Sequence, residues 1–295
     1  MKTKILIEKL KLETESLIGF WKRFKKNKAA LLGLFIFIFF LIVAITSPFL
    51  SPYDPFDMNL HDPDAPLNPP NSNNLLGTDA AGRDLLSRLM YGAKTSLFIG
   101  FLSTGVSLFI GIIFGSIAGY YGGMWDNIIM RFVDTFLMLP TFFLILIIAA
   151  IFGSNIWNVM WIIGLTGWPG ITRLVRGGFL SFKNMDFVLA AKGSGASDLH
   201  IMFSEILRNA IYPAIVASSM RVSGAIMTES SLSFLGLGDP NAVSWGWLLS
   251  EALRSFRIAW WLSLFPGLAI TIIAIAFNLM GDGINDALNP HLKER

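Results

Sequence analysis

Long apolar runs separated by polar segments dominate this chain. The runs lie at residues 29–47, 95–120, 132–152, 157–174, 209–235 and 260–281. A bilayer core about 30 Å thick requires roughly 20 apolar residues per helix, and backbone groups in lipid must pair within their own segment. A transmembrane β-barrel would show many segments of about ten alternating residues, a pattern this sequence lacks. We therefore predict an all-α membrane protein with six transmembrane helices.

Composition agrees with that prediction and narrows the chemistry. Hydrophobic residues make up 54% of the chain and charged residues 15%, with a mean hydropathy of +0.60. A soluble domain has about a quarter of its residues charged. The sequence contains no cysteine, which excludes disulfides and thiolate chemistry. His61, His200 and His291 are scattered, so we predict no metal site. No Ser/His/Asp set follows from spacing, and we predict that the chain is not an enzyme.

Lysine and arginine predict the orientation. The basic residues ahead of the first run are Lys2, Lys4, Lys9, Lys11, Lys22, Arg23, Lys25, Lys26 and Lys28. Basic flanks stay in the cytoplasm, so the N-terminus is predicted inside. Six crossings return the C-terminus inside, where Lys293 and Arg295 lie. No small-residue cleavage site follows the first run, so we expect it to be an uncleaved span.

The runs divide the chain into five predicted parts. These are a cytoplasmic interfacial segment at 1–28, the first transmembrane helix at 29–47, an extracytoplasmic loop with a short helix at 48–94, a five-helix core at 95–281 and a cytoplasmic tail at 282–295. Residues 5–24 place apolar side chains near one helical face. Both a helix in the membrane interface and a flexible polar tail fit that segment.

The outer loop ends in a segment with helical spacing. Gly77-Thr78-Asp79 offers a cap, and the following residues repeat apolar positions at helical intervals. We expect a short amphipathic helix from Gly82 to Met90 on the outer surface. It either contacts an outer partner or caps the bundle. The candidate contact residues are Gly82, Arg83, Asp84 and Arg88.

Small and charged residues within the runs suggest further roles. Gly111, Gly115 and Gly119 are four residues apart, a spacing that lets another helix approach closely. Arg221 and Glu229 are ionisable residues inside the fifth run, and such residues are functional candidates by default. They are eight residues, or about 12 Å of helix rise, apart, too far for a direct pair. They face either a water-filled pathway or a neighbouring helix.

The predicted cytoplasmic loop at 177–208 is too polar to enter the membrane. It contains two short helical patterns separated by small residues between Gly193 and Ser197. Such a break lets two helices meet at an angle and a partner surface approach closely. A docking element for a cytosolic protein and an ordinary connection are both consistent with the pattern, although the segment is long for a connection.

This loop resembles that of membrane subunits in bacterial ABC importers, which carries a coupling helix that seats in the ATPase subunit. The resemblance rests first on Ala190, Ala191 and Gly195. Further segments resemble permeases of the dipeptide/oligopeptide/nickel group, in particular the second of its two paired permeases. These segments are Trp21-Lys22-Arg23-Phe24, Ser51-Pro52-Tyr53-Asp54-Pro55, Leu76-Gly77-Thr78-Asp79, Gly82-Arg83-Asp84, Ser233-Phe234-Leu235-Gly236-Leu237-Gly238, Ser244-Trp245-Gly246 and Asp286-Ala287-Leu288-Asn289-Pro290.

Two positions depart from the family pattern. The family loop usually has Glu before the two alanines, where this chain has Leu189, and Leu-Pro soon after the glycine, where it has Leu207-Arg208. The first departure removes a charge at the ATPase cleft, and whether coupling relies on Asp198 or Lys192 instead stays open. The resemblance assigns ATPase coupling to Leu189, Ala190, Ala191, Lys192, Gly193, Gly195, Ala196, Ser197 and Asp198.

The resemblance implies a type I ABC importer permease in the bacterial cytoplasmic (inner) membrane. Its expected partners are a second, similar permease, two ATP-binding subunits and an extracytoplasmic substrate-binding protein. ATP and Mg²⁺ are expected at the ATP-binding subunits, with no cofactor on this chain. Short peptides are the first expectation for the substrate, and nickel or another metal chelate is the alternative. A stand-alone secondary transporter or channel is the competing class, but it predicts internal repeats, which the sequence lacks.

Overall fold

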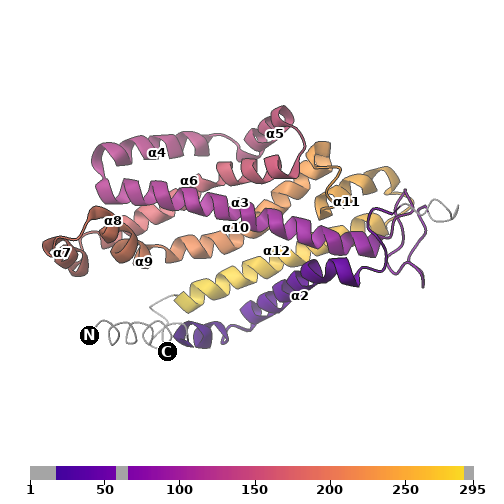
Figure 1. The fold of residues 1–295 in the computed structure, drawn as a ribbon, viewed down its shortest axis with the longest axis horizontal. Coiled ribbons are helices and arrows are strands. Elements are labelled where there is room, and N and C mark those ends of the chain that lie inside the picture. Colours follow the sequence, from indigo (N-terminus) through magenta and orange to yellow (C-terminus); the bar gives the residue numbers. More distant parts are fainter. Residues whose placement is uncertain (1–17, 58–65, 289–295) are drawn as a thin grey trace.

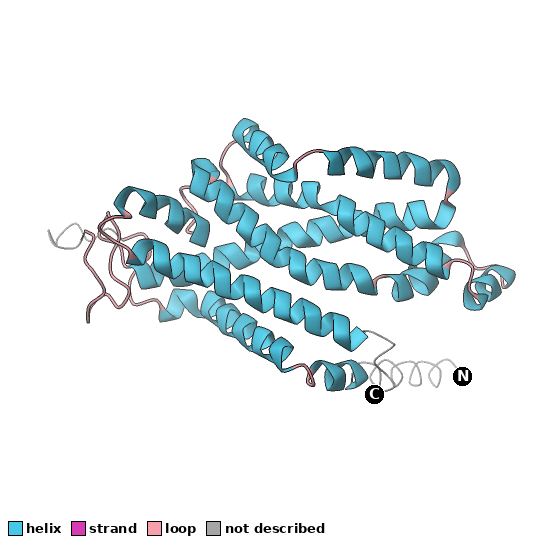
Figure 2. Ribbon diagram, turned by 180° about the vertical axis from the view of Figure 1, so that it is seen from behind, coloured by secondary structure: helices cyan, strands magenta, loops and turns pink. Residues whose placement is uncertain are grey.

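The computed structural model describes residues 18–57 and 66–288, and these residues are helical with no β-strand (Figures 1 and 2). The all-helical prediction is confirmed. The helices are α2 (Lys28–Leu50), α3 (Leu85–Tyr121), α4 (Gly123–Met138), α5 (Thr141–Phe152), α6 (Ile156–Phe182), α7 (Asp186–Gly193), α8 (Asp198–His200), η1 (Ile201–Ile206), α9 (Leu207–Ala210), α10 (Tyr212–Leu232), η2 (Ser233–Leu237), α11 (Trp245–Ala252), η3 (Leu253–Ser255) and α12 (Trp261–Leu288).

Three predicted segments lie partly outside the described residues. The interfacial segment at 1–28 is described from residue 18 onward, and residues 18–24 are helical. The predicted tail at 282–295 is described as far as Leu288, which is the last residue of α12. Part of the outer loop, 58–65, also lies outside the described residues.

Helix α3 begins earlier than the second apolar run. The Asp84 carboxylate accepts a hydrogen bond from the Ser87 N–H at 2.8 Å and so caps the first turn. From Leu85 the helix continues without a break to Tyr121. The short outer helix predicted from Gly82 to Met90 is therefore not a separate element. Its helical part is the first turns of α3, since no proline interrupts the chain there.

The third predicted span, 132–152, is not one helix. Helices α4 and α5 meet there at 85°. Pro140 disfavours the helical conformation at the residue before it, and Leu139 accordingly has φ −81° and ψ 133°. The apolar run at 132–152 is long enough to cross a bilayer, but Pro140 bends the chain within it.

The described residues contain three to five candidate spans, where six were predicted. Helices α2, α3 and α12 are each long and apolar enough to cross a membrane. The bent pairs α4–α5 and Asp198–Ala210 with Tyr212–Leu237 bring the number to five if each pair is one span. Helix α6, the predicted fourth span, is 27 residues long but is not among these candidates.

The helices form an elongated bundle whose two ends differ (Figure 1). Helices α2 and α12 lie side by side and α3 packs along α6. The first residues of α2 and the last of α12 lie toward the end that carries α7, α8 and α9, while α11 lies at the opposite end. The Arg23 Nε–H donates to the Ala287 carbonyl at 2.6 Å and the Asn27 amide to Asp286 at 2.9 Å, which ties the start of α2 to the end of α12.

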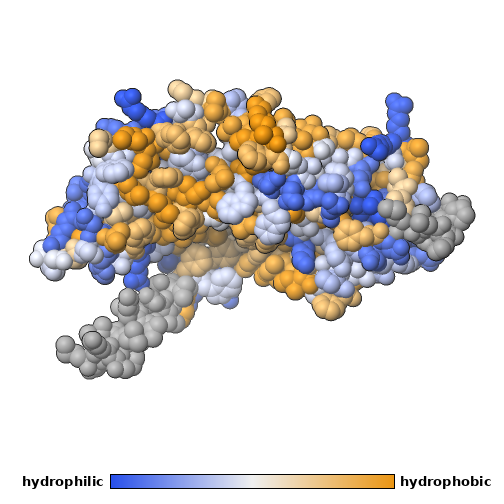
Figure 3. Space-filling view, turned by 45° about the horizontal axis from the view of Figure 1, so that its top comes forward, coloured by the Kyte–Doolittle hydropathy of each residue, from blue (hydrophilic) through white to orange (hydrophobic). Residues whose placement is uncertain are grey.

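Apolar side chains cover much of the outer surface. On α2, Phe35, Phe39 and Ile45 are 70%, 55% and 65% exposed. Figure 3 shows broad hydrophobic areas on one face, with hydrophilic side chains at its left end and over part of its right half. Exposed apolar area of this extent is rare on soluble monomers, and contact with lipid accounts for it.

Gly111, Gly115 and Gly119 of α3 lie against α6. We call these three residues the glycine stripe. A Cβ at Gly111 would lie 2.6 Å from Ile171 Cγ2, and one at Gly115 would lie 2.7 Å from both the Thr172 carbonyl oxygen and Val175 Cβ. A Cβ at Gly119 would collide with Phe179. The two backbones therefore approach at a distance that leaves no room for side chains on this face of α3.

We expect Gly115→Leu to destabilise the protein by about 1–3 kcal/mol or more, because overpacking forces the two helices apart. Thermal unfolding in detergent, followed by size-exclusion chromatography, measures the change. Gly105→Leu is the matched control, since Gly105 is on the same helix and has no atom within 4 Å of its Cβ position. Equal unfolding temperatures for the two variants would contradict a packing role for the stripe.

Candidate functional site

The predicted cytoplasmic loop at 177–208 contains the end of α6 and the short helices α7, α8 and η1. Residues 194–197 form a compact turn between α7 and α8. Gly195 has a φ of +78°, a left-handed conformation that glycine adopts without steric cost. The Gly195 N–H donates to the Lys192 carbonyl at 3.0 Å and the Ala196 N–H to the Ala191 carbonyl at 3.1 Å. These two bonds are the Schellman pattern that ends a helix. The Ser197 hydroxyl oxygen then caps α8, accepting from the His200 N–H.

One side of this turn is anchored in the helical core. Val188 of α7 is fully buried, and so is Ile206 of η1. They belong to an apolar cluster with the second half of α6, against which Ala191 and Ala196 also pack. The buried members of this cluster are Ile171, Val175, Phe179, Val188, Ile201, Met202, Ile206, Ala210 and Ala214. The segment around the turn is thereby packed against α6.

Three apolar side chains of α7, α8 and η1, close to this turn in the sequence, are exposed. Leu189, Leu199 and Phe203 are 52%, 66% and 45% exposed. We call these three residues the docking face. It lies at the end of the bundle where α7 and α8 project beyond the long helices (Figure 1). A surface of this kind, on a polar loop beyond the apolar spans, fits a protein partner rather than lipid.

Lys192 and Asp198 both contact α3 instead of projecting freely. The Tyr120 hydroxyl donates to Asp198 Oδ1 at 2.6 Å. The Lys192 ammonium lies 5.4 Å from the centre of the Tyr120 ring, within cation–π range. Both charged residues of the turn therefore brace it against the end of α3.

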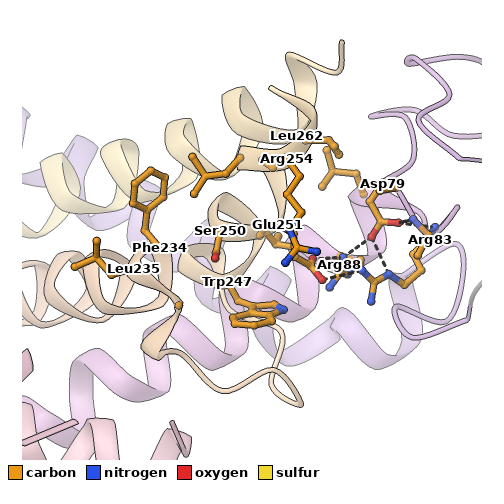
Figure 4. A pocket seen from close by; sticks show the side chains of 17 residues that line it. Asp79, Arg83, Arg88, Phe234, Leu235, Trp247, Ser250, Glu251, Arg254 and Leu262 are labelled. Atoms are coloured by element: carbon orange, nitrogen blue, oxygen red, sulfur yellow. Dashed lines mark hydrogen bonds and ion pairs between the residues drawn. The ribbon is translucent and has the colours of Figure 1, made fainter. Parts of the chain in front are cut away.

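An ionic cluster joins the start of α3 to α11 (Figure 4), and α11 lies at the end of the bundle opposite α7 and α8 (Figure 1). The Arg83 Nε–H donates to Asp79 at 2.7 Å and its Nη2 to Glu251 at 2.8 Å. Arg88 pairs with the same two carboxylates, at 2.6 Å from Glu251. Arg88 is 2% exposed. The cluster joins the outer loop and the start of α3 to α11.

The neighbouring carboxylates together affect the pKa of Arg83 more than its burial does. Burial alone lowers the pKa of its guanidinium, but the charges and hydrogen bonds of Asp79 and Glu251 raise it, and the pKa is raised from its ordinary value. Arg83 therefore stays charged. The cluster borders a cavity of ≈ 550 Å³ that also reaches Trp247, Arg254 and the π-helical turn of η2.

The four predicted outer contact residues thus have different surroundings. Arg83 and Arg88 are in the cluster, whereas Asp84 is buried as the cap of α3 and accepts from the Asn74 amide at 3.0 Å. Gly82 has a φ of +75° in the turn before α3. Sequence reasoning did not single out Glu251, because its partners Arg83 and Arg88 are 168 and 163 residues away and no local pattern marks it.

Glu229 is buried in a hydroxyl cage. Its Oε1 accepts from the Ser233 and Ser244 hydroxyls, both at 2.7 Å, and the side chain is 3% exposed. The Ser244 hydroxyl oxygen also caps α11, accepting from the Trp247 N–H at 3.1 Å. Glu229 therefore joins α10 to the start of α11, a contact between neighbouring helices.

Arg221 has different surroundings from Glu229. It borders a cavity of ≈ 380 Å³ between α3, α5, α6 and α10. The other lining residues are Ser103, Thr104, Ser107, Thr141, Ile145, Ile163, Thr166, Ala217, Met220, Gly224, Ala225 and Thr228. Since Glu229 is absent from this lining, the structure separates the two residues that the sequence paired as pathway candidates.

Comparison with known proteins identifies two matching families. Residues 111–294 match the binding-protein-dependent transport system inner membrane component family, and residues 17–70 match the N-terminal transmembrane domain of oligopeptide transport permease C. The dipeptide transport system permease protein DppC of Escherichia coli (strain K12) is 45% identical over 93% of this chain and 93% of its own. DppC of Bacillus subtilis (strain 168) is 38% identical over 92% of this chain and 85% of its own. OppC, an oligopeptide transport system permease of the same strain, is 36% identical over 94% of this chain and 92% of its own.

A solved structure shares the fold. The MetNI methionine ABC transporter, in inward-facing conformations, has a chain that aligns with a TM-score of 0.55 and 16% identity, covering 68% of this chain and 97% of its own. At this identity the likeness concerns the helical arrangement alone.

Proposed function

Because this chain belongs to the family of binding-protein-dependent transport system inner membrane components, we propose that it is a permease subunit of an ATP-driven importer of short peptides. The docking face is the observation that carries the proposal. Leu189, Leu199 and Phe203 are exposed on a rigid turn anchored to the core, as coupling to an ATPase requires. The fold contributes half of a translocation pathway and no bond-breaking chemistry.

In this proposal the chain crosses the inner membrane six times with both termini in the cytoplasm. Helix α6 supplies the span that completes the five candidates. The start of α2 and the end of α12 lie toward the end that carries the docking face (Figure 1), which supports a common cytoplasmic side. The cluster of Asp79, Arg83, Arg88 and Glu251 then faces the outside.

Coupling proceeds through two contacts of the turn. Two cytosolic ATP-binding subunits bind and hydrolyse ATP with Mg²⁺, and one of them seats on the docking face. The apolar cluster around Val188 passes its movement to α6, and Tyr120 passes it to α3. Since α3 and α6 pack together along the glycine stripe, they move as a unit against a second, similar permease. An extracytoplasmic substrate-binding protein delivers the peptide.

Peptides are preferred to nickel because the relatives reported above are named for dipeptide and oligopeptide transport. Membership of an ABC importer family sets aside the stand-alone secondary transporter or channel. The family pattern at the loop differs at Leu189, where a carboxylate is usual. Exposed leucine at this position makes the contact apolar, and Lys192 and Asp198 are engaged with Tyr120 instead.

Uptake of a labelled dipeptide and of radioactive nickel, measured side by side, tests the proposal. The cells lack this chain, and the intact chain or its Gly195→Trp variant is returned. We expect dipeptide uptake to be lost, restored by the intact chain and not by the variant. If cells lacking this chain lose nickel uptake alone, the substrate is a metal chelate and not a peptide. If they lose neither uptake, both substrate assignments are overturned.

The backbone at Gly195 provides a finer test of the turn. We expect Gly195→Ala to lower dipeptide uptake several-fold, because a left-handed residue with a Cβ is strained by about 1–2 kcal/mol. Gly170→Ala is the matched control: Gly170 of α6 is outside the predicted coupling residues, does not have a positive φ, and also has open space around its Cβ position. Initial uptake rates at equal membrane expression measure both. Equal rates would show that the turn geometry is not required.

A further inference from the structure

The cavity beside Arg221 is lined by apolar and hydroxyl side chains together. Its volume of ≈ 380 Å³ falls in the range of about 300–1,000 Å³ that small-molecule sites occupy. Hydroxyl side chains from α3, α5, α6 and α10 line it. Arg221 is one residue from the middle of α10 (Tyr212–Leu232). An arginine at that depth is costly in lipid, so the cavity provides its polar surroundings.

The Arg221 guanidinium lies directly against Gly167 of α6. A Cβ at Gly167 would lie 2.6 Å from Arg221 Cζ and would collide with Arg221 Nη2. The Ser107 hydroxyl lies against the same point and donates to the Gly164 carbonyl at 2.7 Å. The guanidinium therefore lies across the α6 backbone, where only glycine leaves room for it.

Arg221 has no carboxylate partner within the described part of the chain. The ion pairs found there involve Arg83, Arg88, Arg173, Arg176 and His200. The other charged side chain of the same helix, Glu229, is engaged by serine hydroxyls instead. The cavity consequently carries a positive charge that these residues leave unneutralised.

A second polar group beside the same cavity is also unsatisfied. Thr104 is 5% exposed, and its hydroxyl has no hydrogen-bond partner among the described residues. The other buried hydroxyls of the lining donate to backbone carbonyls: Ser103 to Met160 at 3.0 Å, Ser107 to Gly164 at 2.7 Å and Thr166 to Ile162 at 2.8 Å. A buried polar group without a partner is rare in folded proteins. Thr104 and Arg221 thus offer two donors to whatever occupies the cavity.

We propose that Arg221 and Thr104 form a binding site for the carboxylate of a peptide in transit through this cavity. The inference rests on the proposed importer function. The planar guanidinium donates two parallel N–H bonds to a carboxylate, and the free C-terminus of a short peptide supplies that group. A carboxylate of the second permease is the other source of the same chemistry, and the experiment distinguishes the two.

The experiment uses the complete transporter in proteoliposomes, with both permeases, both ATPases and the binding protein. It measures ATP-driven uptake of labelled dialanine and labelled dialanine amide, which lacks the carboxylate. Arg221→Gln removes the cation, and Gly167→Ala displaces it without changing charge. Gly170→Ala is the control, since Gly170 is on the same helix with nothing within 4 Å of its Cβ position. All variants use the same binding protein, so its own preference for acid or amide cancels when the acid-to-amide uptake ratios of the variants are compared.

We expect Arg221→Gln and Gly167→Ala to lower the acid-to-amide uptake ratio about tenfold, as loss of a charge-assisted hydrogen bond predicts. Gly170→Ala should keep the ratio of the intact protein. As a second measurement, binding of labelled dialanine to the complex without binding protein should weaken about tenfold in the same two variants. Unchanged binding would overturn the site even where the amide is a poor substrate.

The remaining outcomes separate the possible failures. If Arg221→Gln lowers acid and amide uptake equally, Arg221 pairs with a carboxylate of the second permease, and the substrate site is overturned. Dialanine uptake that depends on this chain, with an unchanged ratio in both variants, would overturn the site and leave the importer function standing. If the intact transporter carries neither peptide, the peptide function fails, and the carboxylate site fails with it.

Discussion

Replacing Arg88 by methionine is expected to destabilise the protein by about 3–5 kcal/mol, the largest stability loss that we predict for a single residue. Arg88 is 2% exposed and pairs with Asp79 and Glu251. Methionine fills much of the volume but leaves the buried Asp79 carboxylate with Arg83 as its remaining ion-pair partner among the described residues. The cost is dominated by that poorly compensated charge. Unfolding in mixed detergent micelles, followed by tryptophan fluorescence, measures the change.

Arg254→Met is the matched control for Arg88→Met. Arg254 borders the same cavity but is exposed and takes part in none of the ion pairs of the described chain. We expect its loss to change stability by less than about 0.5 kcal/mol, as for an ordinary surface substitution. A double variant with Asp79→Asn should recover part of the loss, since it removes the stranded charge. Equal stability of Arg88→Met and Arg254→Met would contradict the structural role of the ionic cluster.

Introducing aspartate at Leu199 and Phe203 together is expected to reduce dipeptide uptake by about 100-fold or more, because two desolvated carboxylates oppose an apolar interface. Both side chains are on the docking face, 66% and 45% exposed. Neither belongs to the apolar cluster that anchors the turn, so the permease itself should fold and insert. The ATP-binding subunits should no longer co-purify with the variant. Pull-down from detergent extracts and uptake assays measure the two effects.

The control for this double variant places the same charges at the other end of the bundle. Phe256 and Ile258 are 63% and 71% exposed, in the connection between α11 and α12. Aspartate at both positions should leave co-purification of the ATP-binding subunits unchanged. Retention of those subunits by the Leu199 and Phe203 variant would place the docking surface elsewhere on the chain.

Local sequence determines the helical class of the chain and the form of the turn between α7 and α8. Apolar runs of membrane length lead to helices, since backbone groups in lipid must pair within the segment, and that prediction is confirmed. The turn also follows from neighbours in sequence: small residues end α7, Gly195 takes a left-handed φ of +78°, and Ser197 starts α8. Capping depends on residues within a few positions of each other, and a sequence pattern registers such relations directly.

Tertiary structure decides the contacts between distant residues. The pairing of Arg88 with Glu251 joins positions 163 apart, and the placement of Arg221 across Gly167 depends on the close approach of α10 to α6. The sequence by itself determined that the chain is helical and membrane-like in composition, and it predicted a break between two short helices near Gly195. It marked Arg221 and Glu229 alike as charges in an apolar run. The fold alone separates them, because a charge becomes structural or available to a ligand according to the groups that packing brings beside it.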